Sequence, residues 1–119
     1  MRKNQRTFRK RAKNHINDRC EVTLSGLANL CDACHIKSYS VCNEEEKCDP
    51  NNAIFLLASV HRAFDAGLIS FDDDGNLLLS SELDKWELQC LGLHSNIKIR
   101  MPGKRRFYMG YHRDNIFKI

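Results

Sequence analysis

The sequence predicts an α+β fold in which short strands and helices share one hydrophobic core. Segments with two-residue alternation and segments with three- and four-residue apolar spacing both occur along the chain. The length of 119 residues suits one domain, and only two prolines and six glycines interrupt it. We therefore expect a single domain over residues 1–119, with a basic arm at 1–19, a core at 20–71, and a hairpin with a second basic region at 72–119.

The first half of the chain predicts a helix, two strands and a loop. Residues 7–17 lack Gly and Pro and predict a basic helix. Residues 20–24 alternate and then meet a Ser-Gly turn, which predicts a strand, and residues 30–36 predict a second one. Residues 40–52 are polar and acidic and end in Asp-Pro-Asn-Asn, a sequence typical of a loop.

The clearest helical periodicity lies at residues 53–66, where apolar residues recur at three- and four-residue steps until Gly67 ends the pattern. Residues 68–71 and 77–80 are apolar on either side of Asp-Asp-Asp-Gly-Asn, which predicts a hairpin. The three aspartates lack the remaining ligands of a calcium-binding loop, so we interpret them as a solvated turn.

The C-terminal third predicts a helix at residues 82–91 with Leu83 and Trp86 buried. A short strand is expected at residues 96–101, before a Pro-Gly turn. A terminal helix is expected from Arg105 to the end of the chain. This order of elements completes the α+β prediction.

The ends of the chain are basic and its middle is acidic. Residues 1–19 carry a formal charge of +7, residues 20–97 carry −9, and residues 98–119 carry +6. This pattern fits a polyanion-binding surface around a metal-holding centre, and it equally fits two solvated basic helices. No apolar run approaches the roughly 20 residues of a membrane span, and no hydrophobic segment follows the basic start. We therefore expect no membrane contact and a cytoplasmic location, in a bacterial or phage-infected cell.

Six cysteines in a chain without a secretory signal are expected to be reduced thiols. Cys31 and Cys34 form a C-x-x-C pair, and together with Cys42 and Cys48 they offer four ligands for a structural Zn²⁺. Such a site would stabilise a domain whose core is small. The alternative is that these thiols simply pack in the core, and the sequence leaves both interpretations open.

Four polar side chains form a pattern that suits metal-assisted hydrolysis of a phosphodiester. His61 and Asp65 lie four residues apart on one predicted helix, so they face the same side and can hold one cation. His35, on or just after a predicted strand, could activate a water beside that cation, and Asn52 could fix the loop geometry. The alternatives are a structural helix histidine at His61 and a helix N-cap at Asn52.

Ordered blocks around these residues follow a known pattern. They are Cys-Glu-Val-Thr from residue 20, Ala-Cys-His-Ile-Lys from residue 33, Asn-Ala-Ile-Phe-Leu-Leu from residue 52, and Val-His-Arg-Ala-Phe-Asp-Ala-Gly from residue 60. With them the chain resembles the HNH endonucleases, the ββα-metal or His-Me finger nucleases, in particular the branch associated with restriction enzymes. The resemblance covers about residues 8–118. It implies a ββα-metal core with flanking N- and C-terminal helices.

The resemblance also implies a role for each residue. His35 resembles the general base that deprotonates the attacking water, and Asn52 resembles the residue that positions the catalytic loop. His61 resembles a ligand of the divalent cation, expected to be Mg²⁺ or Mn²⁺, and Asp65 stands where the family places a second ligand. Cys34 occupies a position where many members carry a further Asp or His ligand, a departure that bears on the identity of the metal.

The resulting hypothesis is a metal-dependent HNH endodeoxyribonuclease that cuts double-stranded DNA, as a monomer or a homodimer. The main alternative is a non-catalytic DNA-binding or zinc-stabilised interaction module of the same fold, and a weaker one is an RNA-directed nuclease. The basic side chains predicted to contact phosphates are those of Arg9, Arg11, Lys37, Arg62, Lys104, Arg105 and Arg106.

Overall fold

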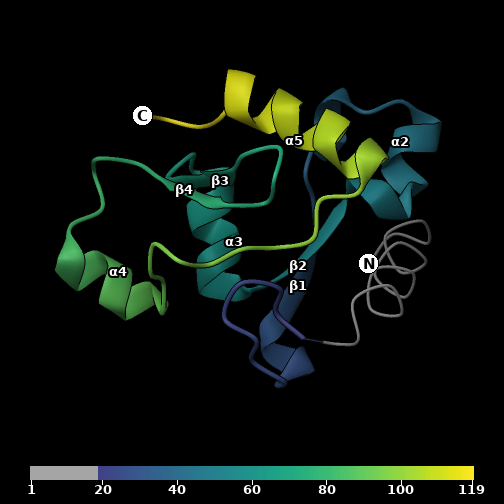
Figure 1. Cartoon of the computed structure of the whole chain (residues 1–119). Helices are drawn as coiled ribbons and strands as arrows, with labels where there is room; N and C mark the ends of the chain where they lie inside the picture. The colour runs from purple at the N-terminus through teal and green to yellow at the C-terminus, as the bar shows by residue number, and fades with distance from the viewer. Residues whose placement is uncertain (1–18) are drawn as a thin grey trace.

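A pair of antiparallel strands followed at once by a helix forms the centre of the fold (Figure 1). The computed structural model describes residues 19–119. Strand β1 (Cys31–His35) pairs over its whole length with β2 (Ala53–Leu57), and helix α3 (Ala58–Asp65) begins directly after β2. Because no loop separates β2 from α3, the helix folds back against the strands. The predicted α+β class and the ββα core are confirmed.

A second antiparallel pair follows the helix. Strands β3 (Ile69–Phe71) and β4 (Leu77–Leu79) form the predicted hairpin. In its turn, Asp72 Oδ1 accepts two backbone N–H groups at 2.9 Å, so this carboxylate shapes the turn. Gly75 has φ +89°, and a Cβ at this position would lie 2.0 Å from the carbonyl oxygen of Ile99. The hairpin tip therefore requires glycine there.

Three further helices surround the strands, and two of them correct the sequence predictions. Residues 40–52, predicted as a loop, contain α2 (Glu44–Cys48), which begins with a capping box between Asn43 and Glu46. Helix α4 (Lys85–Leu91) is present as predicted, but Trp86 is 67% exposed because α4 packs through its leucines instead. The terminal helix α5 (Gly103–Asn115) is confirmed and lies across the hairpin side of the molecule (Figure 1). No helix in the described part of the chain combines the length and apolar character of a membrane span.

Three other predictions about secondary structure were wrong. Residues 53–66 are not one helix, because their first five residues form β2; a short buried apolar run has no periodicity that distinguishes strand from helix. Residues 20–24 form a turn rather than a strand, with Leu24 at φ +64°. Residues 96–101 contain no strand and contact the hairpin through one isolated bridge at Lys98.

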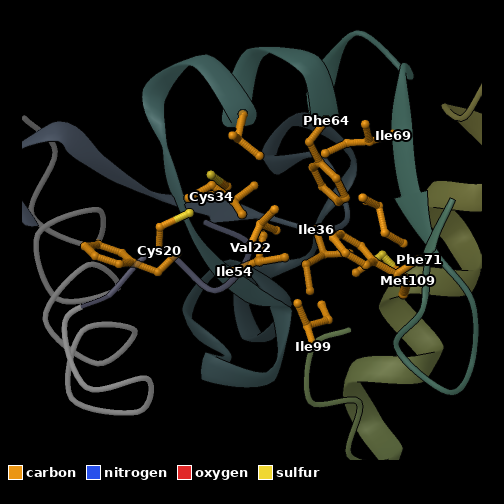
Figure 2. Packing of buried hydrophobic residues seen from close by; sticks show 14 of the residues in the cluster. Cys20, Val22, Cys34, Ile36, Ile54, Phe64, Ile69, Phe71, Ile99 and Met109 are labelled. Atoms are coloured by element: carbon orange, nitrogen blue, oxygen red, sulfur yellow. The ribbon is translucent and has the colours of Figure 1, made fainter. Parts of the chain in front are cut away.

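The core joins the central helix, the hairpin and α5. Figure 2 shows Phe64 of α3, Phe71 of β3 and Met109 of α5 converging near Ile36, and all four side chains are buried. Full burial of a side chain of this size contributes about 1.5–3 kcal/mol. Packing on this face fixes α3 in place.

A buried ion pair links α5 to β2 and to the turn at residues 20–24. Arg105 Nη1 and Nη2 donate to the two carboxylate oxygens of Glu21 at 2.6 Å, and Nη2 also donates to the Ala53 carbonyl at 2.8 Å. Glu21 Oε2 accepts the N–H of Phe55 at 2.9 Å. Arg105 is only 4% exposed, so its guanidinium holds the fold together instead of contacting DNA as the sequence predicted.

Replacing Arg105 should therefore destabilise the fold strongly. Arg105→Met leaves the Glu21 carboxylate buried without its partner, and we expect the free energy of unfolding to fall by about 3–5 kcal/mol. Urea unfolding monitored by circular dichroism measures this loss. The double variant Glu21→Gln/Arg105→Met removes both charges and should lose less than the sum of the single variants; additive losses would contradict a coupled pair.

The buried His112 should make stability depend on pH. Burial lowers the pKa of His112, while its Nε2–H donates to the Phe64 carbonyl at 2.8 Å and its Nδ1 accepts from Ser70 Oγ at 2.8 Å. The fold keeps this imidazole neutral, whereas the unfolded chain binds a proton below about pH 6.5, so the contribution of His112 to stability should decrease as the pH falls through that value. Urea unfolding of wild type and His112→Gln at pH 7.5 and 5.5 tests this. From pH 7.5 to 5.5 the stability of wild type should fall relative to that of His112→Gln, and an equal change in the two proteins would refute the prediction.

Candidate active site

One cavity of about 400 Å³ collects four of the predicted site residues. His35 at the end of β1 lines it together with His61 and Asp65 of α3. Cys34, the neighbour of His35, lines the same cavity. The strand pairing explains this convergence: β1 pairs with β2, and α3 continues from β2 and packs against both strands.

His61 lies between two carboxylates. Its Nδ1 is 2.8 Å from Asp32 Oδ2, and its Nε2 is 2.9 Å from Asp65 Oδ2. The hydrogen bond with Asp65 raises the pKa of His61 to about 9; Asp32 adds to this, and burial opposes it. Asp32 was not among the predicted site residues. The signal that points to it is an acidic residue inside an otherwise apolar strand.

The pair formed by His61 and Asp65 has the geometry of two neighbouring metal ligands. Ligand atoms about 2.0–2.1 Å from an octahedral cation are separated by about 3 Å, close to the observed Nε2–Oδ2 distance of 2.9 Å. Asp32, by binding Nδ1, has the place of an outer carboxylate that orients a metal-binding imidazole. Residues 19–119 contain no group of three or more His, Cys, Asp or Glu side chains that could hold a metal ion. A cation held by His61 and Asp65 would take its other ligands from water and substrate.

The imidazole of His35 is held in one tautomer. Its Nε2 lies 2.8 Å from the carbonyl oxygen of Lys47, and because a carbonyl only accepts, Nε2 must carry the hydrogen. Nδ1 is then the basic nitrogen of the ring. The edge of the ring meets Tyr39 with the ring centroids 5.3 Å apart, which further fixes its orientation.

The amide of Asn52 is completely buried and bridges the segment after β1. Oδ1 accepts the N–H of Lys37 at 2.8 Å, while Nδ2 donates to the Glu46 carbonyl at 3.1 Å and lies 3.4 Å from Cys42 Sγ. Since Lys47 follows Glu46, this bridge also sets the carbonyl that holds the His35 ring. Asn52 precedes a strand and caps no helix, so the N-cap alternative does not apply.

Comparison with known families agrees with this geometry. A family model described as HNH endonuclease matches residues 6–72, more than half of the chain. The chain belongs to the HNH endonuclease family. None of the curated proteins compared with it matches. Membership implies a nuclease-type hydrolase with a nucleic acid substrate, and HNH nucleases generally use a divalent metal.

Helix α5 lies outside the part of the chain matched to the HNH family, yet it supports the turn that carries Asn52. Asp49 Oδ2 accepts from Tyr108 Oη at 2.7 Å and from Lys104 Nζ at 2.8 Å, and the Asp49 carbonyl accepts the N–H of Asn52 at 2.9 Å. Burial raises the pKa of Asp49, but the hydrogen bonds, with those from Asn51, outweigh it and hold the pKa below its ordinary value. Asp49 is therefore a buried carboxylate that links α5 to the HNH motif.

The four cysteines considered as zinc ligands are not brought together. The thiols of Cys31, Cys34 and Cys42 each donate to a different backbone carbonyl, at 3.7, 3.5 and 3.2 Å, and Cys48 joins no group of metal ligands among the described residues. Burial raises the pKa of Cys34 well above its ordinary value, and the nearby charges of Asp65 and Asp32 raise it further. Cys34 is thus a neutral thiol in the HNH cavity, which disfavours the thiolate form that binds metals.

The basic side chains predicted to contact DNA have different surroundings. Lys37 and Lys104 form ion pairs with acidic side chains at 3.0 and 2.8 Å, and Arg105 is buried. Arg62 is exposed and lines a groove of about 840 Å³ that also includes His61 and Asp65. Arg106 is exposed on α5. The predicted helix at 7–17, Arg9 and Arg11 lie outside the described residues.

Removing the Tyr108 hydroxyl tests the link between α5 and the HNH motif. Hydrogen bonds to charged groups contribute about 1.5–3 kcal/mol, so Tyr108→Phe should lower the free energy of unfolding by about that amount. Urea unfolding provides the measurement. Tyr111→Phe, on the same helix with no hydroxyl hydrogen bond among the described residues, is the matched control and should change little. Equal effects of the two substitutions would show that the Asp49 bond contributes nothing.

Proposed function

We propose that the protein is a metal-dependent endonuclease that hydrolyses DNA phosphodiester bonds. The observation that carries this proposal is the single cavity lined by His35, His61 and Asp65. A base and a pair of metal ligands that line one cavity are the groups that metal-assisted hydrolysis of a phosphodiester requires.

His35 acts as the general base. Its Nδ1 takes a proton from the attacking water, and the Lys47 carbonyl, which accepts the Nε2–H, stabilises the imidazolium that results. The bridge made by Asn52 keeps that carbonyl in position during the reaction. The reaction requires neutral His35, so we expect activity at neutral to alkaline pH.

His61 Nε2 and the Asp65 carboxylate would hold one divalent cation, Mg²⁺ or Mn²⁺. When bound, such a cation would stabilise the negative charge that develops on the phosphate and on the leaving 3′ oxygen. Asp32 positions the His61 ring by accepting the Nδ1–H.

Arg62 binds the phosphate backbone beside the site, because it is exposed in the groove that contains both metal ligands. Double-stranded DNA is the proposed substrate. One site cuts one strand per visit, so a double-strand break requires two visits or a homodimer. Free cysteines throughout the described residues support a reducing cytoplasm, as in a bacterial or phage-infected cell, where restriction is one fitting role.

Nicking of supercoiled plasmid tests the function. With Mg²⁺ or Mn²⁺ we expect nicked product that EDTA abolishes, and His35→Ala should lower the rate by about 10²–10⁴-fold through loss of the general base. His61→Ala and Asp65→Ala should also lose activity. His94→Ala removes an exposed histidine that is not part of the cavity lining and should retain the wild-type rate.

The outcome that would overturn the proposal is retained DNA binding without cleavage in any divalent metal. It would instead support the non-catalytic binding module. A parallel assay on RNA of the same sequence decides between deoxyribonuclease and ribonuclease activity.

A further inference from the structure

Helix α5 presents a groove that the proposed reaction does not use. The groove has a volume of about 530 Å³, and its walls include two aromatic side chains of α5, Phe107 and Tyr111, and three basic ones, Lys37, Arg106 and Arg113. We call it the aromatic groove. Two acidic side chains, Asp73 and Asp114, also line it.

Phe107 is the most unusual residue of the aromatic groove. The buried stripe of α5 consists of residues three and four positions apart, and Phe107 lies off that stripe with 68% of its surface exposed. Its ring makes an edge contact with Tyr108, with centroids 5.7 Å apart, and this contact orients it. A large apolar ring held in water beside cations is typical of a surface that binds a flat ligand.

Tyr111 lies one helical turn after Phe107, so both rings are on the same side of α5. The ammonium group of Lys37 lies 5.5 Å from the centre of the Tyr111 ring, and Glu46 holds that ammonium at 3.0 Å. The Tyr111 ring is thus fixed by a cation–π contact. The groove therefore has one exposed ring, Phe107, beside one anchored ring.

The basic side chains supply positive charge for an anion. Arg113 is paired with Asp73 at 2.8 Å, but Arg106 has no acidic partner among the described residues and donates only its Nε–H to the Asp73 carbonyl at 3.0 Å. A neighbouring hollow of about 500 Å³ shares Arg106 and Asp73 with the groove and adds the exposed Lys98 and Arg100 together with Asp74. Arg106 is therefore the basic side chain of the groove that is available to a phosphate.

One segment of the chain borders both the aromatic groove and the candidate active site. His35, Ile36 and Ser38 line the catalytic cavity, and Lys37, between them in the sequence, lines the aromatic groove. Neighbouring residues of this segment therefore line the two sites.

We propose that the aromatic groove binds an unpaired nucleotide of the substrate strand close to the cut, with its base stacked on Phe107 and a neighbouring phosphate on Arg106. Aromatic stacking combined with cations is the chemistry by which proteins bind single-stranded nucleic acid. This inference rests on the proposed function and refines its substrate: DNA with unpaired bases beside the scissile bond binds better than continuous duplex.

Binding of fluorescently labelled single-stranded and duplex oligonucleotides, measured by anisotropy in EDTA so that no cleavage occurs, tests this inference. Phe107→Ala should weaken binding to the single strand at least about fivefold, the lower end of the stacking contribution of one base. Phe107→Trp should retain wild-type binding, and Phe107→Leu should behave like Phe107→Ala. Trp86→Ala, which removes an aromatic ring of matching exposure (67%) from α4, should have no effect.

Equal effects of Phe107→Ala and Trp86→Ala would overturn the inference, as would wild-type binding by Phe107→Leu, which would show that any apolar group suffices. The plasmid assay separates this result from the proposed function. Cleavage by a wild-type protein whose binding is indifferent to Phe107 refutes only the aromatic groove. Absence of cleavage together with a Phe107-specific loss of binding refutes only the nuclease.

Discussion

The buried amide of Asn52 is the constraint on which the rest of the site depends. In the low dielectric of the core each of its polar atoms must find a partner, and the partners are backbone groups at Lys37 and Glu46 and the Cys42 thiol. The segment between β1 and α2 therefore has one favourable conformation. That conformation places the Lys47 carbonyl where it fixes the tautomer of His35. The Asn52 amide thus fixes the conformation of this segment and, through the Lys47 carbonyl, the tautomer of His35, the proposed base.

His61 depends on charge rather than on a buried amide. Two carboxylates around His61 stabilise positive charge at one point, which is why the pKa of this histidine rises to about 9. The same concentration of negative charge would favour the divalent cation of the proposed reaction. Because metal ligands must be deprotonated, a proton and that cation would compete for Nε2 of His61. His35, in contrast, is held by the neutral carbonyl of Lys47.

Local patterns in the sequence predict the parts of the site that depend on local geometry. The four-residue spacing of His61 and Asp65 fixes their common face on any helix, and the turn residues at Gly75 fix the hairpin. Residues whose roles come from distant contacts could not be found this way. Asp49 bonds Tyr108, and Glu21 bonds Arg105, and in both pairs the partners lie far apart in the sequence. The residues next to each partner in the sequence therefore give no sign of the contact. The apolar run at β2 was ambiguous for another reason, since burial removes the alternation that identifies a strand.

The buried and the surface residues of helix α5 have different roles. Its buried residues, Arg105, Tyr108, Met109 and His112, follow the spacing of one helical face and contact the ββα core and the Asn52 turn. Phe107 and Tyr111 lie off that face and line the aromatic groove. A rotation of α5 by one residue would expose the Arg105 guanidinium and bury Phe107 against polar partners. The ion pair between Arg105 and Glu21 therefore determines which face of α5 is exposed to solvent. The interaction that anchors the helix therefore also determines that Phe107 faces the surface.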